Sequence, residues 1–261
     1  MHESGSKTAL ANGINKTVGW PPGRMPIVPD RTMVMTEAAR EALDGILVAA
    51  WYDKRFGDLG TAAASVLAML LRLYAHEGRP PSAKEIAAAT GFTELETARL
   101  LTALSQHDLV ILERDGATIR GAYPFTQSAT GHSLTFVRRK RALNAMCAID
   151  ALGAGAMCRK DTIIRSGCHL CGMPVIVETR NRGMALDEVR PRSAVVWTGF
   201  RASRGCAADS LCTALVFFCS DGHLDLWRAS GKTNDGRRLS VEEAFQVGKS
   251  LFADRALLGG S

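Results

Sequence analysis

The stretch Ser82-Ala-Lys-Glu-Ile-Ala-Ala-Ala-Thr-Gly-Phe-Thr-Glu-Leu-Glu96 decides the fold of the first half of the chain. It contains two capping boxes, Ser82-Ala-Lys-Glu85 and Thr93-Glu-Leu-Glu96, and a capping box marks the start of a helix. The first box predicts a short helix that ends near Ala89, and the second predicts a helix that runs to about Gln106. Two such helices joined by a tight turn are typical of a helix-turn-helix unit.

Regular patterns continue on both sides of this stretch. Upstream, apolar residues recur at helical spacing from Thr36 to Ala50 and from Thr61 to His76. Downstream, residues 109–112 and 118–120 flank Asp115-Gly116 and predict a small hairpin. We therefore expect a winged-helix-like helical domain over residues 34–125.

The charge of this unit argues against a role in reading DNA. A recognition helix normally carries Lys or Arg toward the phosphates. The second helix of the motif, residues 93–106, has only Arg99 against Glu94 and Glu96. We favour a scaffold, and we do not expect nucleic acid as a partner.

The second half of the chain predicts an α+β domain over residues 126–261. A helix is expected from about Arg138 to Met157, and another from Ser240 to about Leu258. Short runs rich in Val, Ile and Phe predict strands at residues 132–137, 161–166, 174–179, 193–198 and 213–219. Trp227 and residues 231–237 are expected in a loop. The expected fold class is thus α+β, a winged-helix-like helical unit followed by a mixed α/β domain with a small sheet.

Composition places the chain among cytoplasmic globular proteins. Its 261 residues are 46% hydrophobic and carry a formal net charge of +6, which permits anionic partners without demanding them. Apolar runs are far shorter than a membrane span, and residues 1–7 lack a signal-peptide pattern. Residues 1–33, with four prolines, are expected to form a flexible leader. We predict a cytoplasmic location and no membrane partner.

The cysteines are confined to the second half. An odd count without a secretory signal argues against a disulfide framework, so thiols, thiolates or metal ligands are expected. The seven positions are Cys147, Cys158, Cys168, Cys171, Cys206, Cys212 and Cys219.

Cys147 and Asp150 form the first candidate pair. Three residues apart on the expected helix, they would share one face. The neighbours are small and apolar, so the carboxyl could hold a proton and act with the thiol as an acid/base pair. A buried structural cysteine beside a capping aspartate is the alternative, and the spacing alone leaves both open.

Cys168-His-Leu-Cys171 is a second candidate. One such motif resembles half of a zinc ribbon and needs two further ligands. His169, Cys158 or Cys206 could complete it in space. A redox motif would open a helix, whereas Pro174-Val-Ile-Val predicts a strand. Zinc, redox and plain structural interpretations stay open, with zinc or structure favoured.

Cys212, His169 and His223 are single candidates. Cys212 stands where the chain enters an apolar strand, as a small buried residue often does. Each histidine lies in an expected loop without a metal motif, and we assign neither a role.

Three segments together resemble the alkylmercury lyase (organomercurial lyase) family. They are Met146-Cys-Ala-Ile-Asp150, Cys168-x-x-x-Gly172-x-Pro174-Val175 and Ser210-Leu-Cys212-x-x-x-x-Phe217-Phe218. Gly121-Ala-Tyr-Pro-Phe125, followed by His132, also looks like the N-terminal portion of that family. The resemblance covers about residues 60–255, and Cys158, Cys206 and Cys219 are not part of the pattern.

The resemblance implies protonolytic cleavage of a carbon–mercury bond to a hydrocarbon and Hg(II). It assigns the catalytic roles to Cys147, Asp150 and Cys212, which would also hold the mercury of substrate and product. Mercury is a soft metal and thiolates are soft ligands, so the implied chemistry is physically reasonable. No cofactor is required in this interpretation, and zinc at Cys168 and Cys171 is an additional hypothesis.

The partners implied are an organomercurial substrate, cytosolic thiols and a mercuric reductase that receives Hg(II) in a detoxification route. Two alternatives use the same residues. One is a winged-helix protein whose cysteines sense a soft metal, and the other is an enzyme of this fold recruited to another substrate.

Overall fold

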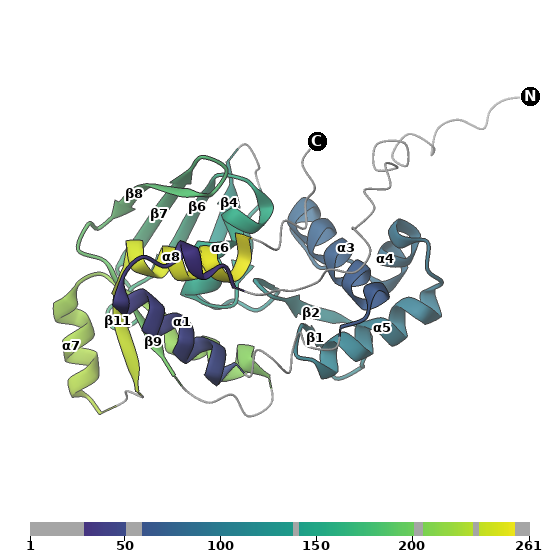
Figure 1. Ribbon diagram of the computed structural model, residues 1–261, viewed down its shortest axis with the longest axis horizontal. Helices are drawn as coiled ribbons and strands as arrows, with labels where there is room; N and C mark the ends of the chain where they lie inside the picture. The colour runs from purple at the N-terminus through teal and green to yellow at the C-terminus, as the bar shows by residue number, and fades with distance from the viewer. Residues whose placement is uncertain (1–28, 51–58, 138–140, 201–205, 232–234, 254–261) are drawn as a thin grey trace, which may run out of the picture.

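The computed structural model describes residues 29–50, 59–137, 141–200, 206–231 and 235–253. Most of the predicted leader and residues 138–140 of the basic run lie outside this part of the chain. The described helices, labelled in Figure 1, are α1 (Glu37–Ala49), α3 (Thr61–Glu77), α4 (Ala83–Thr90), α5 (Glu94–Gln106), α6 (Ala148–Cys158), α7 (Asp221–Ala229) and α8 (Val241–Phe252). Short 3-10 turns lie at Arg31–Met33, Ala207–Asp209 and Cys212–Ala214.

The described strands form two antiparallel sheets. The eight-stranded sheet has the order β1-β2-β3-β5-β4-β6-β7-β8, and the three-stranded sheet has the order β10-β9-β11. The strands are β1 (Val110–Leu112), β2 (Ile119–Ala122), β3 (Phe125–Thr126), β4 (His132–Phe136), β5 (Leu143–Ala145), β6 (Thr162–Gly167), β7 (Pro174–Arg180), β8 (Ala185–Arg190), β9 (Val195–Gly199), β10 (Leu215–Phe218) and β11 (Gly236–Ser240).

Helices α4 and α5 form as predicted from their capping boxes. The side chain of Ser82 accepts from the Glu85 backbone N–H while Glu85 accepts from the Ser82 backbone, and Thr93 and Glu96 do the same at α5. These reciprocal bonds satisfy two of the free donors at each helix start. The predicted hairpin is also present, with β1 antiparallel to β2. The winged-helix assignment itself stays a prediction.

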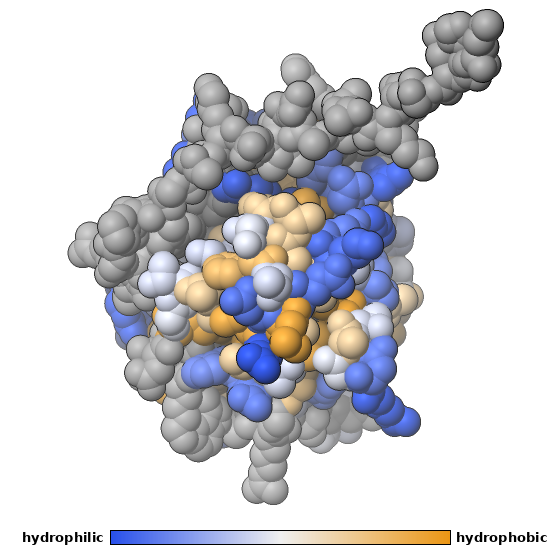
Figure 2. Space-filling model, turned by 90° about the vertical axis from the view of Figure 1, so that its right-hand side faces the viewer, coloured by the Kyte–Doolittle hydropathy of each residue, from blue (hydrophilic) through white to orange (hydrophobic). Residues whose placement is uncertain are grey.

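Figure 2 shows the side of the molecule that lies at the right of Figure 1, where the helices α3, α4 and α5 are found. Hydrophobic residues gather in the middle of this face and hydrophilic residues border them. Helix α5 begins with the exposed residues Glu94, Leu95 and Glu96. Acidic and apolar side chains at this helix start are poorly suited to the phosphates of nucleic acid.

The main sheet is larger than the small sheet we predicted. Strand β3 pairs with β2 on one side and with β5 on the other. The hairpin of the first half is therefore part of the same sheet as the strands of the second half. The two-residue β3 carries too little sequence for a strand pattern, which is why its joining role was not foreseen. The proposed domain boundary at residue 125 falls beside this strand and stays a prediction.

The predicted helix over residues 138–157 was wrong in its first part. Leu143–Ala145 forms strand β5, whose residues alternate between buried and half-buried, and α6 begins only at Ala148. Cys147 between them has an extended backbone, with φ −154° and ψ −178°. The pairing of β5 with β3 and β4 thus overrides the helical propensity of the alanines nearby.

The loop predicted around Trp227 and residues 231–237 was also wrong. Trp227 lies in α7, which Ser220 caps, and Gly236–Ser240 forms strand β11 against β9. Leu224 is the only buried residue of α7, and both α7 and β11 are largely polar, so no apolar run indicated either element.

Helix α1 packs on the second half of the chain. In Figure 1 it lies beside α8, and it contacts both α8 and β11. The Met35 backbone N–H donates to Gln246 Oε1 at 2.8 Å, and the Thr36 hydroxyl donates to Glu243 Oε1 at 3.1 Å. Thus α1 and α8 lie side by side, and α8 also packs closely against α6.

Helix α6 is the centre of the core. All eleven of its residues are buried, among them the candidate Asp150. Alanine and glycine dominate this helix, which lets α8 approach closely. No helix among the described residues is long and apolar enough to cross a membrane.

Candidate functional site

The start of α6 holds the first two candidate residues. Cys147 is the N-cap, and its Sγ accepts from the Asp150 backbone N–H at 3.4 Å. The Cys147 thiol donates to Asp150 Oδ2 at 2.8 Å. The pair therefore meets through helix capping, and our expectation that both share a helix face was wrong for Cys147.

Cys212 reaches the same carboxylate from a distant part of the chain. Its thiol lies 3.7 Å from Asp150 Oδ2, and all three residues are buried. The three candidate atoms lie within 4.8 Å of one another, a spacing that could hold a metal ion. The structure thus brings together all three residues that the sequence singled out.

A cavity of about 560 Å³, counting the open solvent at its mouth, contains this group. Apart from the two thiols, Asp150 and Tyr123, the wall is apolar. Its other members are Ile46, Ala50, Leu109, Ile149, Ala207, Leu211, Leu215, Leu251 and Phe252.

Burial sets the resting state of Cys147. Removal from water, together with hydrogen bonding to Cys212 and the nearby Asp150 charge, raises the pKa of the Cys147 thiol well above its usual range. The residue is therefore a thiol near neutral pH in the empty site. A metal that replaces the proton must hand that proton to an acceptor, and Asp150 Oδ2 is within hydrogen-bonding distance.

Two residues that the sequence analysis did not single out hold the segment before Cys212. The Ala207 backbone N–H donates to Asp108 Oδ2 at 2.9 Å, and the Ala208 N–H donates to the Tyr123 hydroxyl oxygen at 2.8 Å. Tyr123 also donates to Asp108 at 3.3 Å. These contacts fix the 3-10 turn that leads to Cys212. The interacting residues are about 85 to 99 positions apart, so no local pattern indicated them.

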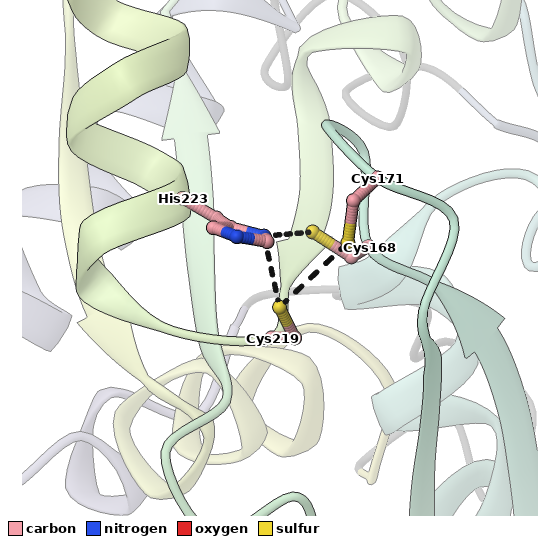
Figure 3. A group of neighbouring side chains, drawn as sticks. All are labelled: Cys168, Cys171, Cys219 and His223. Carbon is pink, nitrogen blue, oxygen red and sulfur yellow. Dashed lines mark hydrogen bonds between the residues drawn. The ribbon is translucent and has the colours of Figure 1, made fainter.

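Cys168 and Cys171 belong to a second group, shown in Figure 3. They lie beside Cys219 and His223, and the four ligand atoms are within 4.8 Å of one another. This group does not include Cys158, Cys206 or His169, which we had considered as partners of the CxxC motif. His169 instead packs edge-on against Trp227. The C-x-x-x-H spacing of Cys219 and His223 was the signal that could have identified the right partners.

The fold and the first group define a class of site: two thiols and one carboxyl around a common point in a largely apolar cavity, suited to a soft metal and a proton. A model of the family described as "Alkylmercury lyase" matches residues 125–253. Residues 125–253 of this chain therefore resemble the alkylmercury lyase family, and two relatives extend the similarity to 70% or more of the chain.

Individual relatives show the same similarity. An alkylmercury lyase of Staphylococcus epidermidis is 29% identical over 184 residues, which are 70% of this chain and 80% of that protein. An alkylmercury lyase of Bacillus cereus is 25% identical over 195 residues, which are 75% of this chain and 84% of that protein.

A solved structure has the same fold. It is the mercury-bound form of MerB2, with a TM-score of 0.65 and 22% sequence identity. The match covers 85% of this chain and 100% of that one.

Proposed function

We propose that this protein is an organomercurial lyase, which cleaves a carbon–mercury bond by protonolysis and releases a hydrocarbon and Hg(II). The observation that carries the proposal is that Asp150 Oδ2 lies within reach of two thiols, at 2.8 Å from Cys147 and 3.7 Å from Cys212. One oxygen can thus take a proton from either sulfur and return it to a third atom between them.

The first step is capture of the organomercurial cation. R–Hg⁺ arrives bound to a cytosolic thiolate, and Cys147 exchanges with that thiolate to form a sulfur–mercury bond. The departing thiolate takes up the Cys147 proton, so charge balances. Because thiolate sulfur is a soft ligand, this exchange suits a soft cation.

The second step breaks the carbon–mercury bond. The Cys212 thiol passes its proton to Asp150 and its sulfur adds to mercury, which raises the electron density on the bound carbon. Protonated Asp150 then delivers that proton to the carbon. The products are the hydrocarbon RH and Hg(II) held by the Cys147 and Cys212 thiolates, with no change of oxidation state. The apolar wall keeps competing water away from the proton.

The partners follow from this chemistry. Cytosolic thiols deliver the substrate and remove Hg(II) by exchange, and a mercuric reductase is the expected recipient of the released metal. Cytosolic thiols and a mercuric reductase are both available in the cytoplasm, where we place this protein. No cofactor takes part in either step.

The first prediction tests the proton shuttle. Purified protein, methylmercury or phenylmercury and excess thiol are mixed, and methane or benzene in the headspace is measured by gas chromatography. Asp150→Asn keeps the size of the side chain but cannot shuttle the proton, so we expect hydrocarbon release to fall about 10²- to 10⁴-fold. Cys147→Ser and Cys212→Ser remove a mercury ligand and should also abolish release.

Cys158→Ala is the matched control, because this cysteine is buried in the same helix α6 but does not line the cavity. It should retain wild-type release. Full activity of Asp150→Asn would contradict the assignment of the proton donor. Stoichiometric mercury binding without hydrocarbon release would instead identify a metal-binding protein or an enzyme with another substrate.

A further inference from the structure

We propose that Cys168, Cys171, Cys219 and His223 form a second metal site, a closed Cys₃His centre for a structural Zn²⁺ ion. The inference does not rest on the proposed lyase activity. It starts from the four ligand atoms, which lie within 4.8 Å of one another and come from two separate parts of the chain.

The distances match those that a zinc ion would impose. Tetrahedral zinc with ordinary Zn–S and Zn–N bonds separates two sulfurs by about 3.8 Å and a sulfur from a nitrogen by about 3.5 Å. The Cys171 and Cys219 sulfurs are 3.9 Å apart. His223 Nδ1 lies 3.6 Å from the Cys168 sulfur and 3.1 Å from the Cys219 sulfur. Figure 3 shows the side chains pointing toward a common centre.

The backbone around the first two ligands has the form of a metal-binding turn. Cys168 and Cys171 lie in the connection between β6 and β7, where the Gly172 backbone N–H donates to the Cys168 carbonyl at 2.8 Å. Gly172 adopts φ +75°, a value that an L-residue rarely takes. The Met173 N–H points at the Cys171 sulfur, at 3.5 Å. Such a bond stabilises a thiolate, the form of cysteine that binds metal.

The other two ligands lie at the start of α7. Cys219 follows strand β10, Ser220 caps the helix, and His223 is in the first turn. His223 in the first turn of α7 and Cys219 just before the helix both lie close to Cys168 and Cys171 in the β6–β7 connection. A short, mostly polar helix with one buried residue gains little from the hydrophobic core, so a metal ligand in its first turn would supply the missing anchor.

The number and kind of ligands favour zinc. Three sulfurs and one imidazole complete a tetrahedron without an open position. Closed sets of this kind are typical of structural zinc. A structural role also fits the location, because strand β10 runs from this group back to the turn that carries Cys212.

Zinc analysis of the full-length protein tests the proposal. Protein made in zinc-supplemented medium, kept reduced and desalted, should contain about one zinc ion per chain by mass spectrometry of the metal. Cys171→Ser is the main variant, because this ligand is exposed and its loss should not prevent folding. We expect it to lose zinc to a chelator at least about 10-fold more readily than wild type.

Two controls locate the metal. Cys158→Ala removes a cysteine outside both groups, and Cys147→Ser removes one from the cavity, so both should keep the zinc of wild type. Co²⁺ replacement provides a measurement that does not depend on folding of a variant. The wild-type protein should show thiolate-to-cobalt charge transfer and the visible bands of a tetrahedral ion, and Cys171→Ser should change them.

Three outcomes would overturn the proposal. The first is reduced wild-type protein that holds neither zinc nor cobalt. The second is zinc lost in Cys147→Ser but kept in Cys171→Ser, which would place the metal in the cavity. The third is a Cys171–Cys219 disulfide in protein isolated without reductant, which would make these residues a covalent pair.

Discussion

Cys147 performs two tasks at one position. It is a helix N-cap, a place that Ser, Thr, Asp and Asn usually occupy, and it is also the proposed mercury ligand. Its thiol contacts Asp150 through both the side chain and the backbone N–H. The local structure that starts α6 therefore also sets the distance between thiol and carboxyl.

The second prediction is that two substitutions of Cys147 affect stability differently although both abolish activity. Cys147→Ser keeps an N-cap oxygen, so we expect the free energy of unfolding to be equal to wild type or higher. Cys147→Ala removes the cap and should cost about 1 kcal/mol. Urea unfolding followed by circular dichroism measures both. Equal stability of the two variants would show that the N-cap hydrogen bond contributes nothing to the free energy of unfolding.

His132 supplies a third prediction, on pH. Burial, with a smaller contribution from His169, lowers the pKa of His132 from 6.5 to about 4. Its Nδ1 lies 2.8 Å from the Ser166 hydroxyl. Because the unfolded chain binds this proton more readily, stability is fully present above pH 6.5 and is lost as the pH falls toward 4. The shift corresponds to about 3 kcal/mol.

Denaturant unfolding at several pH values between about 4 and 7 measures this linkage. Glutamine does not titrate, so in His132→Gln the free energy of unfolding should fall less between pH 7 and pH 4 than in wild type, by about the same 3 kcal/mol. An unchanged pH profile in that variant would assign the acid sensitivity to other groups.

At the level of elements, helices α6 and α8 cross at very close range. A Cβ atom on Gly153 would come within 2.5 Å of the Gly248 carbonyl oxygen, and one on Gly248 would lie 2.8 Å from the Gly153 nitrogen. Both obstacles are backbone atoms, which cannot rotate away. The two glycines therefore set the distance between the helix that carries Asp150 and the helix that covers it.

The fourth prediction concerns this crossing. Gly153→Ala should destabilise the protein by about 1–3 kcal/mol through overpacking. Thermal unfolding measures it, and Gly222→Ala in α7 is the matched control, since the nearest atom to its Cβ would be the Ser220 hydroxyl at 3.9 Å. The control should be neutral or slightly stabilising, because alanine is a better helix former than glycine. Equal effects of both substitutions would contradict the packing argument.

The elements that the sequence predicted well are those with strong local signals. Capping boxes located α4, α5 and α8, and apolar runs located β7, β9 and β10. The short or polar strands β3, β5, β8 and β11 were missed because pairing with neighbouring strands, more than their own sequence, makes them form. Helix α7 was missed because it is short and mostly polar. Residues 254–258, in which we expected the last helix to end, lie outside the described part of the chain.

Some site residues were likewise predicted from the sequence, and others were missed. Cys147, Asp150 and Cys212 were found through motifs of a known family, and no spacing rule links Cys212 to a cap 65 residues earlier. Cys219 and His223 were missed because a CxxC motif does not specify where its remaining ligands come from. The side chains of Asp108 and Tyr123 accept hydrogen bonds from the backbone N–H groups of Ala207 and Ala208. Every non-proline residue has such an N–H group, so the sequence does not indicate these contacts.

At the scale of the whole molecule, the cavity is assembled from both ends of the chain. Helix α1 contributes Ile46, α8 contributes Phe252, and the thiols come from α6 and the turn before β10. The helix from the first half thus closes a site whose reacting groups belong to the second half. The cavity wall opposite the thiols is where the organic group of a substrate would lie, so the side chains there should select its size.

The fifth prediction tests this placement. Ile46→Phe enlarges a buried side chain of the wall, which leaves less room for an aryl group than for a methyl group. We expect kcat/KM for phenylmercury to fall about 10-fold or more relative to that for methylmercury, as measured by hydrocarbon release. Val48→Phe on the same helix is the control, because Val48 is 79% exposed and faces away from the cavity. If both variants change the two substrates equally, α1 does not form the wall that contacts the organic group, and its role is limited to packing against α8.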